Sequence, residues 1–142
     1  MPKSTLVGPP LLPPADATLS ACLETAAAAS AFVWMTFRLG KQVTPLTARA
    51  ALALSRHWAA ALERWVQPGD RVAICLPNGP EFVGALFGAF RLGAVAVPLS
   101  ELWRSHEVRA YLDNGGAAAA VVDGELGPVL DEARSELPGL RE

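Results

Sequence analysis

The sequence predicts an α/β fold in which three parallel strands alternate with helices. Three short apolar runs, over residues 72–76, 94–97 and 117–122, are separated by longer segments with helical spacing of their apolar residues. Strands that are apolar on both faces are typical of a parallel sheet covered by helices, and this alternation implies right-handed crossovers. From residue 71 onwards the predicted order is therefore β-α-β-α-β-α.

The segment from residue 68 to residue 99 carries the clearest pattern. Pro80 suits the first position of a helix, and the apolar residues between 81 and 92 cover nearly every face of that helix, which indicates that it is buried. Gly93 is expected to cap the helix, and Arg91 is favourably placed against its dipole. The segment is predicted to be a βαβ unit.

Gly84 and Gly88 lie four residues apart on this buried helix. Glycines at this spacing allow a helix to approach its neighbour closely, and we expect them to pack on the sheet rather than to bind a ligand.

Before this unit the sequence predicts a flexible N-terminal segment, a helix and a hairpin. Residues 1–17 are rich in proline and are expected to be flexible, without a fold of their own. A helix is expected from Leu19 to Ser30. A strand over residues 32–37, a turn at 38–41 and a return strand over 42–44 predict a small β-hairpin.

The first long helix is predicted to begin at Pro45, with Thr44 as its N-cap. Apolar residues recur at spacings of three and four and predict an amphipathic helix. Its predicted buried row is Leu46, Ala50, Leu54, Trp58, Ala61, Leu62 and Trp65. His57 lies beside this row and is expected to be a partly exposed surface histidine.

Two shorter helices are predicted after the βαβ unit. Ser105 is a suitable N-cap for a helix over residues 106–113, and Pro128 is suitable for the start of the last helix. Their expected inward-facing residues are Val108, Tyr111, Leu112, Leu126, Leu130, Ala133 and Leu137.

Composition excludes several classes of function. Hydrophobic residues make up 51% of the chain and charged residues 18%, which is typical of a globular domain. The net charge of −2 argues against a nucleic-acid-binding surface. Cys22 and Cys75 stand alone, which fits a reducing, cytoplasmic setting, and neither they nor the two histidines form a metal-ligand cluster. No apolar run is long enough to predict a transmembrane helix.

Four short motifs follow one another in the second half of the chain. They are Pro-Gly-Asp-Arg-Val-Ala at 68–73, Leu-Pro-Asn-Gly-Pro-Glu-Phe at 76–82, Arg-Leu-Gly-Ala-Val at 91–95 and Val-Pro-Leu at 97–99. In these motifs the chain resembles the N-terminal portion of the AMP-forming acyl-CoA synthetases, or adenylate-forming (AMP-binding) enzymes. The resemblance extends from about Val43 to the end.

The resemblance implies that residues 18–142 are part of a larger N-terminal domain. Members of this superfamily bind ATP with Mg²⁺, form an acyl-adenylate from a carboxylic acid, and then transfer the acyl group to CoA. The family's lysine-containing phosphate loop, rich in Ser, Thr and Gly, is not found in this sequence. We therefore expect a fragment that binds no cofactor and is inactive alone, because nothing in it orients a triphosphate.

No catalytic residue is predicted, and the turn Leu76–Gly79 is best explained as a connection between a strand and a helix. The sequence there matches neither a Walker loop nor GxGxxG. Pro80 removes one backbone donor, and Glu81 places a negative charge where a phosphate would bind.

Arg91 is the one candidate for cofactor binding. The resemblance implies that this residue contacts the phosphates of the CoA nucleotide, for which a guanidinium is well suited. The alternative is that Arg91 only interacts with the helix dipole, and the residues leave both interpretations open.

The segment from Ser100 to Glu107 departs in part from the family pattern. Arg104 and Glu107 match it, whereas Ser100-Glu101 replaces the usual Asn-Pro or Asp-Pro pair. His106 and Glu107 resemble a catalytic pair, but adjacent helical residues face different directions. A solvated helix start is the simpler explanation.

Two alternatives from other classes remain open. One is a fragment of an adenylation unit that loads a carrier protein, and the other is a non-catalytic interaction module. In the interaction module, an exposed sheet edge would pair with a partner chain. An exposed apolar sheet edge is also expected to favour self-association of this chain. The sequence does not indicate which carboxylic acid the parent enzyme would activate.

Overall fold

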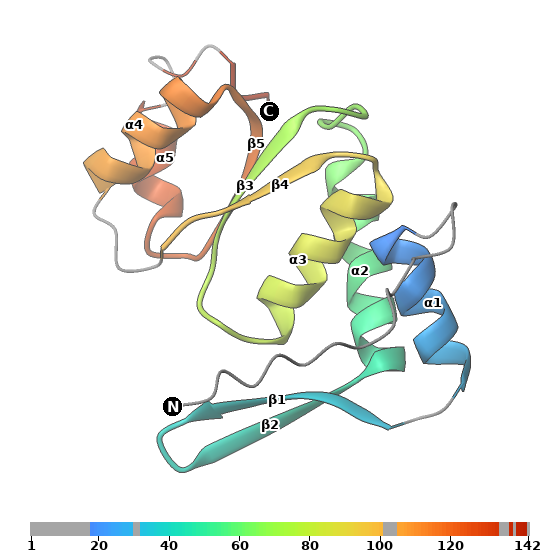
Figure 1. Ribbon diagram of the computed structural model, residues 1–142. Helices are drawn as coiled ribbons and strands as arrows, with labels where there is room; N and C mark the ends of the chain where they lie inside the picture. The colour runs from blue at the N-terminus through green and yellow to red at the C-terminus, as the bar shows by residue number, and fades with distance from the viewer. Residues whose placement is uncertain (1–17, 30–31, 101–104, 134–136, 138, 142) are drawn as a thin grey trace, which may run out of the picture.

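The computed structural model describes residues 18–29, 32–100, 105–133, 137 and 139–141 (Figure 1). The elements are α1 (Leu19–Ala29), β1 (Val33–Leu39), β2 (Gln42–Thr47), α2 (Ala48–Leu62), β3 (Arg71–Cys75), α3 (Pro80–Arg91), β4 (Val95–Pro98), α4 (Ser105–Gly115), β5 (Ala117–Val122) and α5 (Gly127–Ala133). The predicted N-terminal segment over residues 1–17 lies outside the described residues.

The parallel sheet has the strand order β4-β3-β5. β3 pairs in parallel with both neighbours, and Val72 lies between Ala96 of β4 and Ala119 of β5. The prediction of an α/β fold with three alternating parallel strands is confirmed. A helix and an antiparallel β1–β2 hairpin precede the sheet, also as predicted.

Helices cover both faces of this sheet, which explains why its strands are apolar on both sides. Val72 and Ile74 of β3 point into a core that includes Ala85 and Ala89 of α3. Ala73 and Cys75, which alternate with them, point into a second core with Val108 of α4 and Leu130 of α5. In Figure 1 the sheet accordingly lies between the pair α2–α3 and the pair α4–α5.

The ends of α3 follow from the sequence as predicted. Pro80 occupies its first turn, and Gly93 follows its last residues with φ of +70°. The amide of Gly93 donates to the carbonyl of Phe90, and the amide of Ala94 donates to that of Ala89, at 3.1 and 3.0 Å. This pair of bonds is the Schellman arrangement, which favours glycine because its φ is positive.

Gly84 and Gly88 permit close packing, but on α2 and not on the predicted sheet. A Cβ at Gly84 would lie 2.8 Å from Leu54 Cβ, and one at Gly88 would lie 2.7 Å from Trp58 Cβ and 3.0 Å from the backbone nitrogen of Ala59. The expectation was wrong because α3 is covered on two sides, and its alanines rather than its glycines face the strands.

The predicted start of α2 at Pro45 with a Thr44 cap is wrong. Pro45 lies within β2, and Thr47 is the N-cap, with its Oγ1 accepting a hydrogen bond of 3.1 Å from the amide of Ala50. Both threonines satisfy the sequence rule for a cap, but the hairpin ladder continues to Thr47 and delays the helix.

The buried row of α2 also differs from the predicted one. Ala50 and Ala61 are exposed, whereas Leu54, Trp58 and Trp65 are partly buried. The buried residues of the helix are Ala48, Ala51, Ser55 and Leu62. Leu54 and Trp58 of α2 meet α3 at Gly84 and Gly88, so the small residues of this contact are on α3. His57 is exposed, as expected.

The later helices agree with their predicted inner faces except at Tyr111. Val108, Leu112, Leu130 and Leu137 are buried, but Tyr111 is 51% exposed. In α4 the contact with the sheet is narrow and Val108 and Leu112, four residues apart, fill it. The side chains of Ser105 and Ala133 lie outside the described residues.

Residues after α5 return to the sheet and are held there by Arg141. Its amide donates to the carbonyl of Ala118 in β5 at 2.8 Å, and its guanidinium donates to both carboxylate oxygens of Asp70, at 2.5 and 3.3 Å. Its Nη1 also donates to the carbonyl of Trp65 at 3.0 Å. One side chain therefore joins the end of the chain to the turn before β3.

Replacing Gly88 by alanine tests the contact between α2 and α3. We expect Gly88→Ala to lower the free energy of unfolding by about 1–3 kcal/mol, the range for overpacked cores, because Trp58 and the α2 backbone leave no room for a methyl group. Urea denaturation measures this. Gly115→Ala is the control, since no atom lies within 4 Å of its added Cβ. Equal stability of the two variants would contradict the prediction.

Acid should weaken the attachment made by Arg141. The hydrogen bond from the amide of Gln67, and then the Arg141 guanidinium, hold the pKa of Asp70 below its usual value. A carboxyl with a lowered folded-state pKa stabilises the fold above its unfolded-state pKa, which is about 3.9, and this contribution is lost as pH falls through the folded-state pKa. Between pH 2 and 5, urea midpoints of Asp70→Asn should therefore depend less on pH than those of the wild type. Urea midpoints that change equally with pH in Asp70→Asn and in the wild type would contradict this prediction.

Candidate functional site

The carboxyl edge of the parallel sheet is the candidate site. After β3 the chain enters α3 on one face of the sheet, and after β4 it leads towards α4 on the other face (Figure 1). Ligands of open α/β sheets bind where neighbouring strands send their connections to opposite faces. In the described residues this edge consists of 76–79 after β3, 99–100 after β4 and 123–125 after β5.

Two contacts fix the ends of β3 and β4 side by side. The amide of Leu99 donates to the carbonyl of Ile74 at 2.8 Å, and the thiol of Cys75 lies 3.4 Å from the carbonyl of Ser100, to which it donates. Cys75 is only 1% exposed, so its thiol packs as a small apolar group. Neither Cys22 nor Cys75 forms a disulfide.

The turn between β3 and α3 has the properties of a structural connection. Gly79 is the N-cap of α3 and provides no side-chain cap. Glu81 lies in the first helical turn, where its Oε2 accepts a hydrogen bond of 2.8 Å from the indole nitrogen of Trp58. The carboxylate already interacts with the positive end of the helix dipole, so this helix start is poorly suited to a phosphate.

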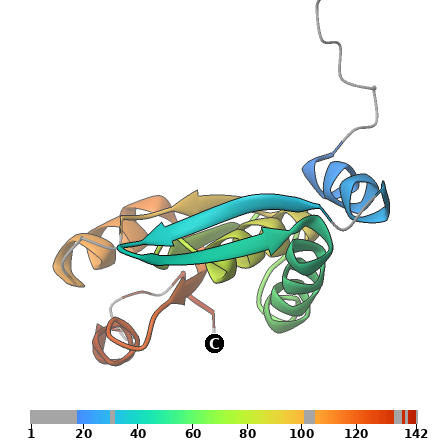
Figure 2. The same ribbon diagram turned by 90° about the horizontal axis from the view of Figure 1, so that it is seen from below.

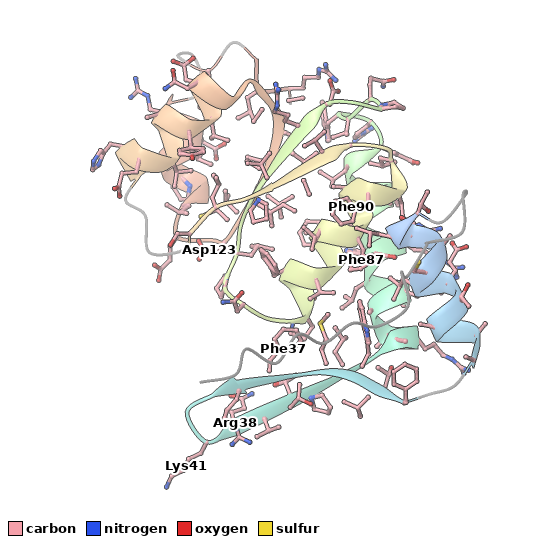
Figure 3. The ribbon with its side chains drawn as sticks, viewed as in Figure 1. Phe37, Arg38, Lys41, Phe87, Phe90 and Asp123 are labelled. Carbon is pink, nitrogen blue, oxygen red and sulfur yellow. The ribbon has the colours of Figure 1, made fainter. Side chains whose placement is uncertain are left out.

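Asp123 ends β5 and shapes the loop into α5 (Figure 3). Its Oδ1 accepts hydrogen bonds from the amides of Glu125 and Leu126, each 3.1 Å long. The sequence carries a signal for this role, because an Asp-Gly pair shortly before a helix is typical of a capping turn. Among the residues that the structure describes, no group of three His, Cys, Asp or Glu side chains could hold a metal ion.

Arg91 lies at the opposite end of α3 from this edge. Its Nη1 donates to Oε1 of Glu24 in α1 at 2.8 Å, and the two side chains are 23% and 47% exposed. Arg91 therefore links α1 to α3, which neither sequence interpretation included. Glu24 precedes Arg91 by many residues, and no local pattern indicates the pairing.

The segment after β4 is described only in part. Glu101 and Arg104 lie outside the described residues, whereas His106 and Glu107 lie in the first turn of α4 and are exposed. His106, Arg109, Ala110 and Asp113 line an open hollow of about 190 Å³ along this helix. A solvated helix surface explains these residues.

Within the described ranges, no helix has the length and apolar character needed to cross a membrane.

The sequence matches the family model of the AMP-binding enzymes over residues 21–141. It is 37% identical over 71 residues to "Long-chain-fatty-acid–CoA ligase FadD13" of Mycobacterium tuberculosis, an alignment that covers 50% of this chain and 14% of that protein. It is also 37% identical over 89 residues to the long-chain-fatty-acid–CoA ligase of Haemophilus influenzae, an alignment that covers 61% of this chain and 16% of that protein. The chain thus spans about one sixth of the length of these relatives or less.

Solved structures show the same arrangement of helices and strands. The N-terminal domain of FACL13 from Mycobacterium tuberculosis superposes with a TM-score of 0.70 at 27% identity, over 85% of this chain and 32% of that one. The anthranilate CoA ligase AuaEII, solved with anthranoyl-AMP, gives a TM-score of 0.70 at 25% identity, over 85% of this chain and 23% of that one.

The family match runs from residue 21, within α1, to the residues that return to β5, so it includes nearly all of the described fold. The fold is shared with solved acyl-CoA ligase domains over 85% of this chain. The chain belongs to the AMP-binding enzyme family.

Proposed function

We propose that the chain is the N-terminal part of an AMP-forming acyl-CoA ligase. The parent enzyme would activate a carboxylic acid with ATP and then transfer the acyl group to CoA. The observation that carries this proposal is the family match over residues 21–141, supported by relatives that are named as acyl-CoA ligases. Those names favour CoA over a carrier protein as the acceptor.

The described residues support a role as framework rather than as the nucleotide site. At the carboxyl edge, Glu81 is bound by Trp58 and Asp123 by the loop into α5, and both are acidic. These groups do not fit a triphosphate, and the described residues hold no cluster for Mg²⁺. ATP and Mg²⁺ would accordingly be bound by other segments of the parent enzyme.

Two further proposals concern the cellular compartment of the protein and its self-association. Two cysteines without a disulfide suit a reducing compartment, and we propose a cytoplasmic location. Unpaired sheet edges support weak self-association of this chain.

Two assays test the proposed function. The chain alone, mixed with ATP, Mg²⁺, CoA and a panel of carboxylic acids, should release no pyrophosphate above background, because it lacks groups that stabilise phosphoryl charge. A chimera in which residues 19–141 replace the matched segment of FACL13 should still form acyl-CoA. We expect its rate within about a hundredfold of FACL13, the cost of small misplacements of catalytic groups.

The same chimera carrying Gly88→Ala should be slower, because the added methyl group meets Trp58, which also binds Glu81 at the carboxyl edge. The chimera carrying Gly115→Ala is the matched control, since no atom lies within 4 Å of its added Cβ. Circular dichroism establishes that each chimera is folded. Pyrophosphate release by the chain alone would refute the inactivity, and a folded chimera that forms no acyl-adenylate would refute the shared framework.

The CoA contact inferred for Arg91 needs a separate test. If Arg91 binds a CoA phosphate, Arg91→Gln in the chimera should raise the KM for CoA at least tenfold and leave the KM for ATP unchanged. Glu24→Gln is the control, because it breaks the same ion pair but keeps the cation. An equal effect of both variants on KM would show that only the link between α1 and α3 matters.

A further inference from the structure

The β1–β2 hairpin leaves the outer edges of both its strands without a partner strand in the part of the chain that the structure describes. Its sheet contains β1 and β2 only, and β1 is seven residues long with the sequence Val-Trp-Met-Thr-Phe-Arg-Leu. In Figure 2, β1 lies on the side of the hairpin away from α2. An irregularity interrupts the pairing of β1 with β2 between Val33 and Met35, and regular pairing runs from Met35 to Leu39. This regular, proline-free part of the edge is a template for pairing with another strand.

Pro45 determines which backbone groups of β1 point outwards. Pro45 lies opposite Thr36 in the hairpin, and it has no N–H to donate. In an antiparallel pair, hydrogen-bonded positions alternate with positions that exchange no bonds. Thr36 and Pro45 must therefore be a non-bonded pair, so the amide and carbonyl of Thr36 face the outer edge of β1. By the same alternation, the amide and carbonyl of Arg38 also face the outer edge of β1.

The other strand edges are less suited to pairing. On β2 the same alternation turns Pro45 outwards, where it offers no donor. On β4 the amides of Val95 and Leu99 donate to β3, so Pro98 also faces outwards without a donor. On β5 the carbonyl of Ala118 already accepts from Arg141. Of these edges, β1 alone has no proline and no bound segment among the described residues.

We propose that two copies of this chain pair antiparallel through β1, with Thr36 on the two-fold axis. The two Thr36 residues would exchange both of their outward hydrogen bonds. Met35 of one copy would lie opposite Phe37 of the other, and both belong to the face that packs on α3. Thr–Thr pairs and sulfur–aromatic pairs are favourable cross-strand neighbours, so β1 is complementary to itself in this register.

Charge favours this antiparallel register over a parallel one. Arg38 and Lys41 lie at the tip of the hairpin and project from the body of the molecule (Figure 3). In the proposed pair, the two Arg38 residues are separated by about 14 Å along the strand. This exceeds the Debye length of about 8 Å at physiological salt. A parallel pair would bring the two arginines together.

Position 36 offers a direct test on the full chain. Thr36 is exposed, so its replacement leaves the core intact. In sedimentation velocity between 10 and 300 μM, the wild type should show association that rises with concentration. Thr36→Lys places two cations opposite each other on the axis and should weaken association at least tenfold, whereas Thr36→Val, which keeps a β-branched side chain, should not.

Disulfide trapping gives a second measurement that does not depend on weak binding. In a Cys22→Ser background, Thr36→Cys should form a disulfide-linked dimer under mild oxidation, because bonded antiparallel partners have Cα atoms about 5.5 Å apart. Arg38→Cys should form little dimer, because its two copies are about 14 Å apart along the strand.

This inference rests on the proposed self-association, and the outcomes separate the two. A wild type that stays monomeric, with no trapping at position 36, overturns both. Association that Thr36→Lys leaves unchanged, or equal trapping at positions 36 and 38, overturns the β1 interface and shifts self-association to another edge. Neither outcome bears on the acyl-CoA ligase assignment.

Discussion

The contact between α2 and α3 holds the two halves of this chain together. α3 lies on the parallel sheet through its alanines and against α2 through Gly84 and Gly88, where an added methyl group would meet Leu54 and Trp58. α1 and the hairpin in turn pack on the remaining surface of α3, with Trp34 in edge-to-face contact with Phe87 at 5.5 Å. The first half of the chain reaches the sheet through α3 and through Leu62 and Val66, which share its core.

The βαβ unit could be predicted because its signals are local. Pro80 begins α3, Gly93 ends it in the left-handed region, and the apolar runs on either side form strands within a residue or two of their expected ends. The start of α2 could not be predicted in the same way. Thr44-Pro45 and Thr47 both satisfy the rule for a helix start, and only the pairing of β2 with β1 decides between them.

Long-range polar contacts could not be predicted from the sequence. Trp58 binds Glu81 and Arg91 binds Glu24, and in each case the partners lie on different helices. The family motifs predicted the fold correctly. In the described parts of the chain, however, the residues of these motifs have structural roles. Asp70, in the first motif, fixes Arg141 and the turn before β3. Sequence motifs identify the family here without identifying a catalytic group.

The ion pairs Arg91–Glu24 and Arg141–Asp70 lie towards the end of the sheet where its strands begin. The ends of β3 and β4 are instead joined by a backbone hydrogen bond and the buried thiol of Cys75. Electrolyte screens exposed charges far more than it weakens buried contacts. Salt therefore weakens these two ion pairs, where the strands begin, more than it weakens the contact between the ends of β3 and β4.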